Sequence, residues 1–197
     1  LGYKLAPTHA ELFRGDNGEN ADAKGEFLFA ASYNAEHTQS YGGTTYLTLS
    51  TLKGGSDTEA AESLTLTGIN GGWAGNRVPD HYVQTYFAPT AADFATGEYT
   101  IADKRGQYFY IKGRAQSMEG NLNTFLNGWS CIKYNNVPHD MDAVDYAATA
   151  ATKNFSDIDW PLIRLGEIHL IYAEACMHAG GDAPAQVAAL AERAGVA

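Results

Sequence analysis

The stretch Pro161–His178 reads PLIRLGEIHLIYAEACMH and has the spacing of an amphipathic helix. Apolar side chains recur every three or four positions, which places them on one helix face that we expect to be buried. Asp159 stands where an N-cap is expected, and Pro161 falls in the first turn, where a missing N–H costs little. The predicted apolar face comprises Leu162, Ile163, Leu165, Ile168, His169, Ile171, Tyr172 and Cys176.

A second helix is predicted directly after the first. Gly180 and Gly181 end the first helix, because glycine adopts the left-handed C-terminal conformation at little cost. Asp182 and Pro184 are typical of a new helix start. The face of this second helix comprises Val187, Leu190, Ala191 and Ala194. The C-terminal part of the chain is therefore predicted to be a pair of helices joined by a short turn.

These two helices carry a resemblance to a known family. Asp159–Ala175 and Glu192–Val196 follow the pattern P-x-x-R-x-x-E-x-x-L-x-Y-A-E-A … R-A-G, which resembles the SusD/RagB family of Bacteroidetes surface lipoproteins. Weaker similarities to that family extend the resemblance upstream over the whole chain. They lie in Glu26–Tyr33, in Gly72–Arg77 (G-W-x-G-x-R), in Asp103–Arg105 (D-x-R) and in Lys133–Tyr134.

The resemblance implies a mainly α fold, with helices packed in the helical-repeat (TPR-type) manner, long loops and a few short β-strands. Family members carry an N-terminal lipoprotein signal and a long helical-repeat region, and neither is visible here. We therefore expect residues 1–197 to be a single C-terminal region of a longer chain. Contact with the membrane is expected only through an N-terminal lipid anchor that this chain lacks.

Composition narrows the possible ligands. The 197 residues are 45% hydrophobic, which indicates a folded core, and the formal net charge is −10. Such a charge disfavours nucleic acid and sulfated glycans as partners, but leaves neutral ligands open. Cys131 and Cys176 are too few for a disulfide framework. Because Cys176 falls on the predicted apolar face, we expect it to be a buried free thiol.

Several upstream segments have local structural signals. Glu26–Tyr33 is predicted to be a buried strand, and Thr44–Leu52 is rich in β-branched residues and is predicted to be a strand or an extended edge. Pro79–Ala88 has helical spacing after a proline start. The two ends of Gly106–Tyr134 are predicted to pair as a hairpin, and Asp103 with Arg105 is interpreted as a structural ion pair.

Neither a metal site nor catalysis is favoured. Arg14–Gly25 is predicted to be a solvated loop, because Gly18 stands where a calcium loop needs an oxygen donor. The aspartates of two loops could form a glycosidase pair, but capping and solvation are the commoner uses of such residues. These aspartates are Asp140, Asp142, Asp145, Asp157 and Asp159. The histidines have no metal-ligand spacing. We therefore expect no enzyme activity, no metal and no cofactor.

Carbohydrate binding is better supported. A sugar ring offers an apolar C–H face and a rim of hydroxyl groups, which suit an exposed aromatic ring and nearby polar side chains. Aromatic residues in Gly- and Asn-rich loops are therefore candidates. Packing is the favoured alternative for Trp73, surface exposure is favoured for Tyr41, and both remain open for Trp129. The predicted carbohydrate-binding residues are Tyr41, Asn70, Trp73, Asn76, Arg77 and Trp129.

The resemblance implies non-catalytic capture of a neutral oligo- or polysaccharide at the bacterial outer-membrane surface. The glycan would then pass to a SusC-like TonB-dependent transporter. Binding residues vary within the family with the glycan, so no fixed set is carried over. The alternative is a protein-interaction or scaffold segment that contacts the transporter or peptides.

Overall fold

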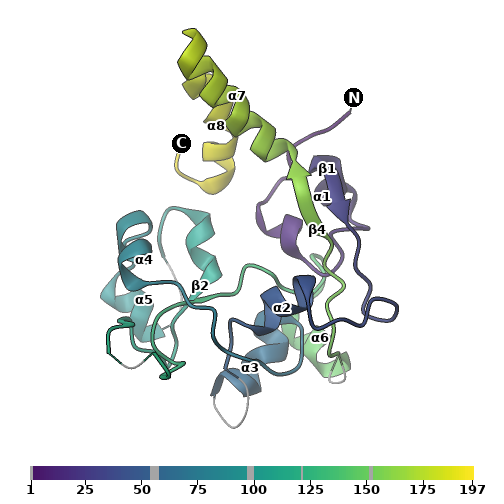
Figure 1. The fold of residues 1–197 in the computed structure, drawn as a ribbon, viewed down its shortest axis with the longest axis vertical. Coiled ribbons are helices and arrows are strands. Elements are labelled where there is room, and N and C mark those ends of the chain that lie inside the picture. Colours follow the sequence, from purple (N-terminus) through teal and green to yellow (C-terminus); the bar gives the residue numbers. More distant parts are fainter. Residues whose placement is uncertain (1, 54–57, 97–99, 121, 151–152) are drawn as a thin grey trace.

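The computed structural model describes residues 2–53, 58–96, 100–120, 122–150 and 153–197. These residues are mostly helical with a few short strands, which confirms the predicted fold class (Figure 1). Among them, no helix is both long and apolar enough to cross a membrane. The α-helices are α1 (Ala21–Glu26), α2 (Gly43–Leu49), α3 (Thr58–Thr67), α4 (Asp80–Tyr86), α5 (Ala91–Thr96), α6 (Ala143–Thr149), α7 (Leu165–Ala179) and α8 (Ala183–Ala194). Two 3-10 helices, η1 (Ala10–Phe13) and η2 (Lys104–Tyr108), and four strands, β1 (Phe27–Ala31), β2 (Phe109–Tyr110), β3 (Ser130–Cys131) and β4 (Trp160–Arg164), complete the described secondary structure.

The helical hairpin α7–α8 is confirmed, and it extends from one end of the molecule (Figure 1). Gly180 ends α7 with a left-handed conformation (φ +75°). Asp182 caps α8 by accepting a hydrogen bond from the backbone N–H of Ala185 at 3.1 Å. Cys176 is a buried free thiol, as predicted.

The predicted start of the first helix is wrong. Residues 160–164 form β4, which pairs antiparallel with β1, and α7 begins only at Leu165. A residue before proline prefers extended backbone, and a two-stranded sheet tolerates proline because both of its strands are edges. Asp159 is therefore not a helix cap. Its carboxylate instead accepts a hydrogen bond from the backbone N–H of Tyr33 at 2.8 Å.

The predicted burial of the α7 face is wrong for most of its members, although Cys176 is buried and Leu165 and His169 are half-buried. Within α7 the buried residues are Gly166, Ala173 and Cys176. The large apolar residues lie at the surface because α8 covers only one side of α7. The exposed large hydrophobic residues of β4 and α7 are Trp160, Leu162, Ile163, Ile168, Leu170, Ile171, Tyr172 and Met177.

The upstream predictions have mixed outcomes. The helix after Pro79 (α4) and the β2–β3 hairpin are confirmed. β1 lies within the predicted Glu26–Tyr33 strand, but it is not buried. The predicted Arg14–Gly25 loop contains the start of α1. The predicted Thr44–Leu52 strand is wrong because α2 occupies most of it.

Packing is distributed over several small clusters. One joins Leu12 and Phe13 of η1 to the N-terminal segment, and another packs Val137 against Tyr146 of α6. A third surrounds Trp129, which contacts the side of α4 and β2. Such small cores leave the connecting loops to be fixed by hydrogen bonds.

Candidate functional site

Four aromatic rings from separate segments gather at the surface: Tyr41 and Tyr46 at α2, Trp73 in a glycine-rich loop, and Phe155 before β4. The Tyr41 ring centre lies 5.7 Å from that of Trp73 and 5.2 Å from that of Phe155. The Tyr46 and Trp73 ring centres are 6.3 Å apart. Tyr41 is 67% exposed and Trp73 is 42% exposed, so these rings offer an open apolar surface. We call this cluster the aromatic site.

Trp73 is held by the end of α2. The backbone N–H of Trp73 donates to the carbonyl of Leu49 at 2.8 Å, and the N–H of Asn76 donates to the carbonyl of Ser50 at 3.0 Å. The last carbonyls of a helix lack partners within the helix, so the loop satisfies them. Gly75 adopts φ +108°, a conformation that favours glycine. The local sequence therefore sets where the tryptophan ring lies.

Polar groups border the rings. Asn76 donates from Nδ2 to Ser50 Oγ at 2.8 Å, and its Oδ1 accepts from the Tyr46 hydroxyl at 3.5 Å. Phe155 also borders a neighbouring cavity of about 270 Å³. The residues that line this cavity are Ala35, Glu36, Gln39, Lys153, Asn154 and Phe155. The aromatic site thus joins exposed rings to a polar hollow.

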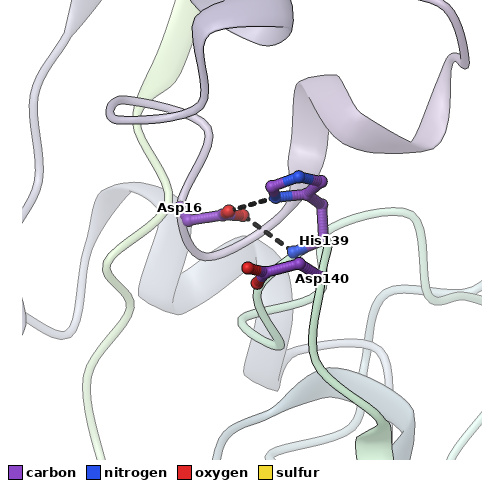
Figure 2. Close-up of side chains that lie close together, drawn as sticks. All are labelled: Asp16, His139 and Asp140. Carbon is purple, nitrogen blue, oxygen red and sulfur yellow. Dashed lines mark hydrogen bonds and ion pairs between the residues drawn. The ribbon is translucent and has the colours of Figure 1, made fainter.

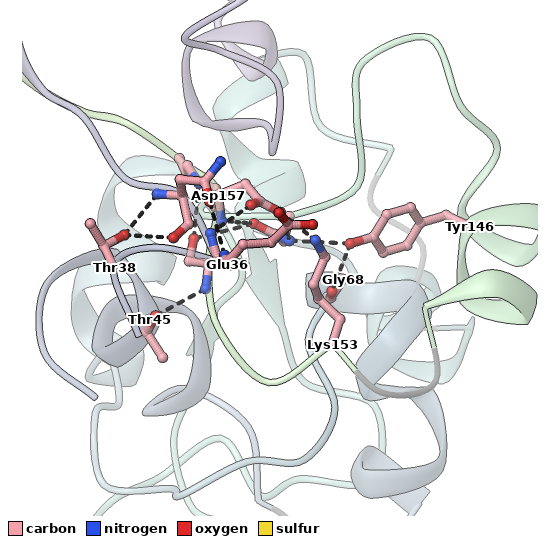
Figure 3. Close-up of polar contacts among 12 residues, drawn as sticks. Glu36, Thr38, Thr45, Gly68, Tyr146, Lys153 and Asp157 are labelled. Atoms are coloured by element: carbon pink, nitrogen blue, oxygen red, sulfur yellow. Dashed lines mark hydrogen bonds and ion pairs between the residues drawn. The ribbon is translucent and has the colours of Figure 1, made fainter. Parts of the chain in front are cut away.

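A hydrogen-bond network fixes the segments beneath this hollow (Figure 3). Asp157 accepts from the backbone N–H of Ala35 at 2.8 Å and forms an ion pair with Lys153 at 2.7 Å. The Tyr146 hydroxyl donates to the carbonyl of Gly68 at 3.2 Å. These contacts tie residues 34–38 to residues 153–157, so the hollow and Phe155 are positioned together.

The structure separates the predicted residues into two groups. Tyr41, Trp73 and Asn76 lie in the aromatic site, and the expected exposure of Tyr41 is confirmed. Trp73 is both packed, edge-on to Tyr41, and open to solvent. Asn70 is exposed, and its backbone N–H donates to the carbonyl of Lys153 at 2.9 Å, beside the hollow.

Trp129 and Arg77 do not fit a binding role in this conformation. Trp129 is fully buried, and its Nε1 donates to Asp80 at 3.2 Å. Arg77 donates to the carbonyls of Leu122 and Thr124 at 2.9 and 2.8 Å, so its guanidinium anchors a loop. Of the two alternatives left open for Trp129, the structure supports packing, and the sequence could not decide this because the partners of Trp129 include residues of α4 and β2.

Sequence reasoning missed Tyr46 and Phe155. Tyr46 lay in a segment predicted to be a strand, where its side chain could not be placed beside Tyr41. Phe155 is the single aromatic residue of the polar run Lys153–Asp157. An aromatic residue alone in a polar loop was the sequence feature that could have marked it as a binding candidate.

Three of the five aspartates considered for catalysis, Asp142, Asp157 and Asp159, have structural partners. Asp142 caps α6, accepting from the backbone N–H of Val144 at 2.8 Å, as predicted for such loops. Asp157 and Asp159 each accept a backbone N–H from residues 33–35. Asp103 and Arg105 form the predicted ion pair at 2.6 Å.

One group in the described residues has the composition of a metal site (Figure 2): Asp16, His139 and Asp140, whose potential ligand atoms all lie within 4.8 Å of one another. Asp16 also accepts from the backbone N–H of His139 at 2.9 Å and pairs with its ring Nδ1. This hydrogen bond raises the pKa of His139. The ion pair accounts for the approach of His139 and Asp16 without a metal. Asn20, another oxygen-bearing side chain of the Arg14–Gly25 segment, caps α1.

Comparisons with known proteins identify the class. A family model, the SusD family, matches residues 81–197, which is more than half of the chain, and the chain therefore belongs to this family. The starch-binding protein SusD of Bacteroides thetaiotaomicron is 27% identical over 224 residues, which cover 98% of this chain and 38% of the relative. A crystal structure of a SusD superfamily protein from Parabacteroides distasonis shares the fold, with 19% identity and a TM-score of 0.50. That match covers 100% of this chain and 36% of the other, so the chain spans little more than a third of either relative.

Proposed function

We propose that the aromatic site binds a neutral oligo- or polysaccharide without cleaving it. The observation that carries this proposal is the open contact between Tyr41 and Trp73 beside the polar hollow. Aromatic faces match the C–H faces of sugar rings, while Asn76, Gln39 and Asn154 offer partners for hydroxyl groups. The aromatic site is accessible because both rings are strongly exposed.

The comparisons support the ligand class. The curated relative is named a starch-binding protein, and starch is a neutral glycan. A neutral ligand also agrees with a chain whose net charge is −10. A binding role without catalysis is supported by the structural partners of Asp142, Asp157 and Asp159.

We further place this activity at the bacterial outer-membrane surface, in a lipid-anchored protein that delivers glycan to a SusC-like TonB-dependent transporter. Family membership supports this placement. Its test is co-purification of the full-length protein with an outer-membrane transporter from the native bacterium. Recovery of the protein in the soluble cytoplasmic fraction alone would contradict it.

A different observation favours the rival role, a protein-contact segment. The apolar residues of β4 and α7 remain exposed, including Leu170 and Ile171, each more than half exposed. Large exposed apolar patches mark interaction surfaces. If contact with the transporter is the main role, Ile171→Glu abolishes that contact, and no neutral glycan binds the intact protein.

The aromatic site is tested by affinity electrophoresis in gels that contain starch and other neutral glycans, followed by calorimetry with the best ligand. Trp73→Ala and Tyr41→Ala are each expected to weaken binding by about 1–3 kcal/mol, by analogy with the stacking of nucleic-acid bases on aromatic rings. Tyr3→Ala is the matched control, because Tyr3 is also exposed but lies outside the aromatic site. Unchanged affinity in both site variants would overturn the proposal.

A further inference from the structure

A second cavity, of about 320 Å³, lies on different elements from the aromatic site, between α4, η2 and β3. One side of it is aromatic and the other is basic. We call it the Arg105 pocket. Its lining includes Tyr82, Tyr86, Phe87, Phe109, Arg105 and Lys133. Among the described residues that line it, none is an aspartate or a glutamate.

The aromatic side forms a supported platform. Tyr82 and Tyr86 lie one turn apart on α4, and their ring centres are 4.9 Å apart. Phe87 and Phe109 pack against Tyr82, their own ring centres also lie 4.9 Å apart with the rings tilted, and Phe109 is buried. Tyr86 is 65% exposed, so its ring is available to a ligand.

The basic side has unused donor capacity. Arg105 donates from Nε and Nη2 to Asp103 at 2.9 and 2.6 Å, and its Nη1 has no partner among the described residues. The Lys133 ammonium lies 3.9 Å from the centre of the Phe13 ring and has no carboxylate partner in the described part of the chain. Both cations can therefore donate hydrogen bonds to an anionic group, and Arg105 can do so through Nη1 while it keeps its pair with Asp103.

The surroundings are locally positive in a chain whose net charge is −10. His9 lies at the border of the pocket, and burial together with the nearby cations lowers its pKa to about 3, so this ring is neutral. The cations that act on His9 are Lys133, Arg164, Arg193 and Arg105. Two carboxylates offset part of this positive charge: Asp103 pairs with Arg105, and Glu26 pairs with both Arg164 and Arg193. A larger cavity of about 400 Å³ shares His9 and Arg105 and adds Lys104, Arg193 and the carboxylate of Asp103.

We propose that the Arg105 pocket binds a sugar residue that carries a carboxylate, as a uronic acid does. The C–H face of the ring packs on Tyr82 and Tyr86, and the carboxylate is held by Arg105 Nη1 and Lys133. The volume is at the lower end of the ~300–1,000 Å³ of small-ligand pockets, which suits one ring and not a chain. This inference rests on the proposed glycan-binding function and extends it to a second, acidic residue class.

The test is calorimetry of the protein with trigalacturonate and with its methyl ester, which keeps the rings and removes the charges. We expect the acid to bind about tenfold or more tightly than the ester, as the loss of charge-assisted hydrogen bonds implies. Equal affinities would overturn the proposal. So would competition by a short peptide with a free C-terminus that binds as tightly, because the pocket would then recognise peptide carboxylates.

Variants locate the contact. Arg105→Gln and Lys133→Met are each expected to weaken trigalacturonate binding by about tenfold, and Tyr86→Ala weakens both the acid and the ester. Lys4→Gln removes an equal charge from an exposed pair elsewhere and leaves the affinity unchanged. Circular dichroism checks the fold of each variant. If Arg105→Gln does not fold, the trigalacturonate affinity of Tyr86→Ala, a substitution at a surface position, tests the assignment instead. Full affinity in both Arg105→Gln and Tyr86→Ala would refute the assignment.

The failure of this inference and the failure of the proposed function give different results. If starch or another neutral glycan binds and trigalacturonate does not, the Arg105 pocket is not a sugar-acid site and the proposed function stands. If no glycan of either class binds, both are wrong.

Discussion

Glu26 and Arg193 lie 167 residues apart in the sequence and form a buried ion pair. The Glu26 carboxylate is fully buried, and it also accepts from Arg164 Nη1 at 2.9 Å and from the backbone N–H of Ala6 at 2.8 Å. One carboxylate therefore joins the N-terminal segment, β4 and α8. Arg164 and Arg193 are the two arginines of the P-x-x-R … R-A-G pattern, so that pattern has a structural explanation.

Arg193→Met is expected to destabilise the fold strongly. The substitution leaves Glu26 buried with one cation fewer, and breaking a buried ion pair from one side costs about 3–5 kcal/mol. Urea unfolding followed by circular dichroism measures the loss. Lys112→Met is the matched control, because Lys112 pairs with Glu62 at the exposed surface, where a pair contributes about 1 kcal/mol or less. Similar losses in the two variants would show that the Glu26 carboxylate does not hold the three segments together.

Gly75→Ala is expected to impair the aromatic site. Gly75 has φ +108°, with open space where a Cβ would be, so the cost is conformational, about 1–2 kcal/mol, and shifts the loop that carries Trp73. Gly180→Ala has a similar conformational cost at φ +75°, again with open space for a Cβ, but lies at the end of α7. Calorimetry with a neutral glycan should show weakened binding only in Gly75→Ala. Equal affinities in both variants would mean that the loop does not position the ring.

The C-terminal hairpin was predictable because its signals are local. Gly180, Asp182 and the periodicity of α8 lie within a few residues of the features that they determine. β4 was not predictable in this way, because it pairs with β1, about 130 residues away along the chain. Spacing alone also could not show that α8 covers only part of the apolar face of α7.

The error at α2 has a different cause. β-branched residues favour strands mainly because their side chains pack well on a sheet, and no sheet contains this segment, which forms a helix. The Thr48 hydroxyl donates to the carbonyl of Thr44 at 2.8 Å, so the helix satisfies this polar group internally. Because Tyr46 lies on α2, this error also concealed one of the four rings of the aromatic site.

His139 is expected to make stability depend on pH. The hydrogen bond that the His139 ring donates to the Asp16 carboxylate raises the pKa of His139 above the ordinary value of 6.5. The folded chain therefore binds this proton more tightly than the unfolded chain does. This stabilisation is fully present below the unfolded pKa and is lost as the pH rises through the folded pKa. An NMR titration of His139 measures the shift, and Asp16→Asn should move the pKa back towards 6.5. A pKa at or below 6.5 in the unaltered protein would contradict the ion pair.

Substitution of Trp129 is expected to lower the stability of the fold, whereas substitution of Trp73 is expected to lower glycan affinity. Both residues follow a glycine in the sequence. Trp129→Ala removes a fully buried ring and should cost about 3–5 kcal/mol of unfolding free energy. Trp73→Ala removes a ring at the surface, so its cost should be about 1 kcal/mol or less, while glycan affinity falls. Trp129→Phe keeps most of the buried area and should retain glycan affinity. Loss of glycan affinity in a folded Trp129→Phe variant, with full affinity in Trp73→Ala, would show that Trp129 and not Trp73 contacts the glycan.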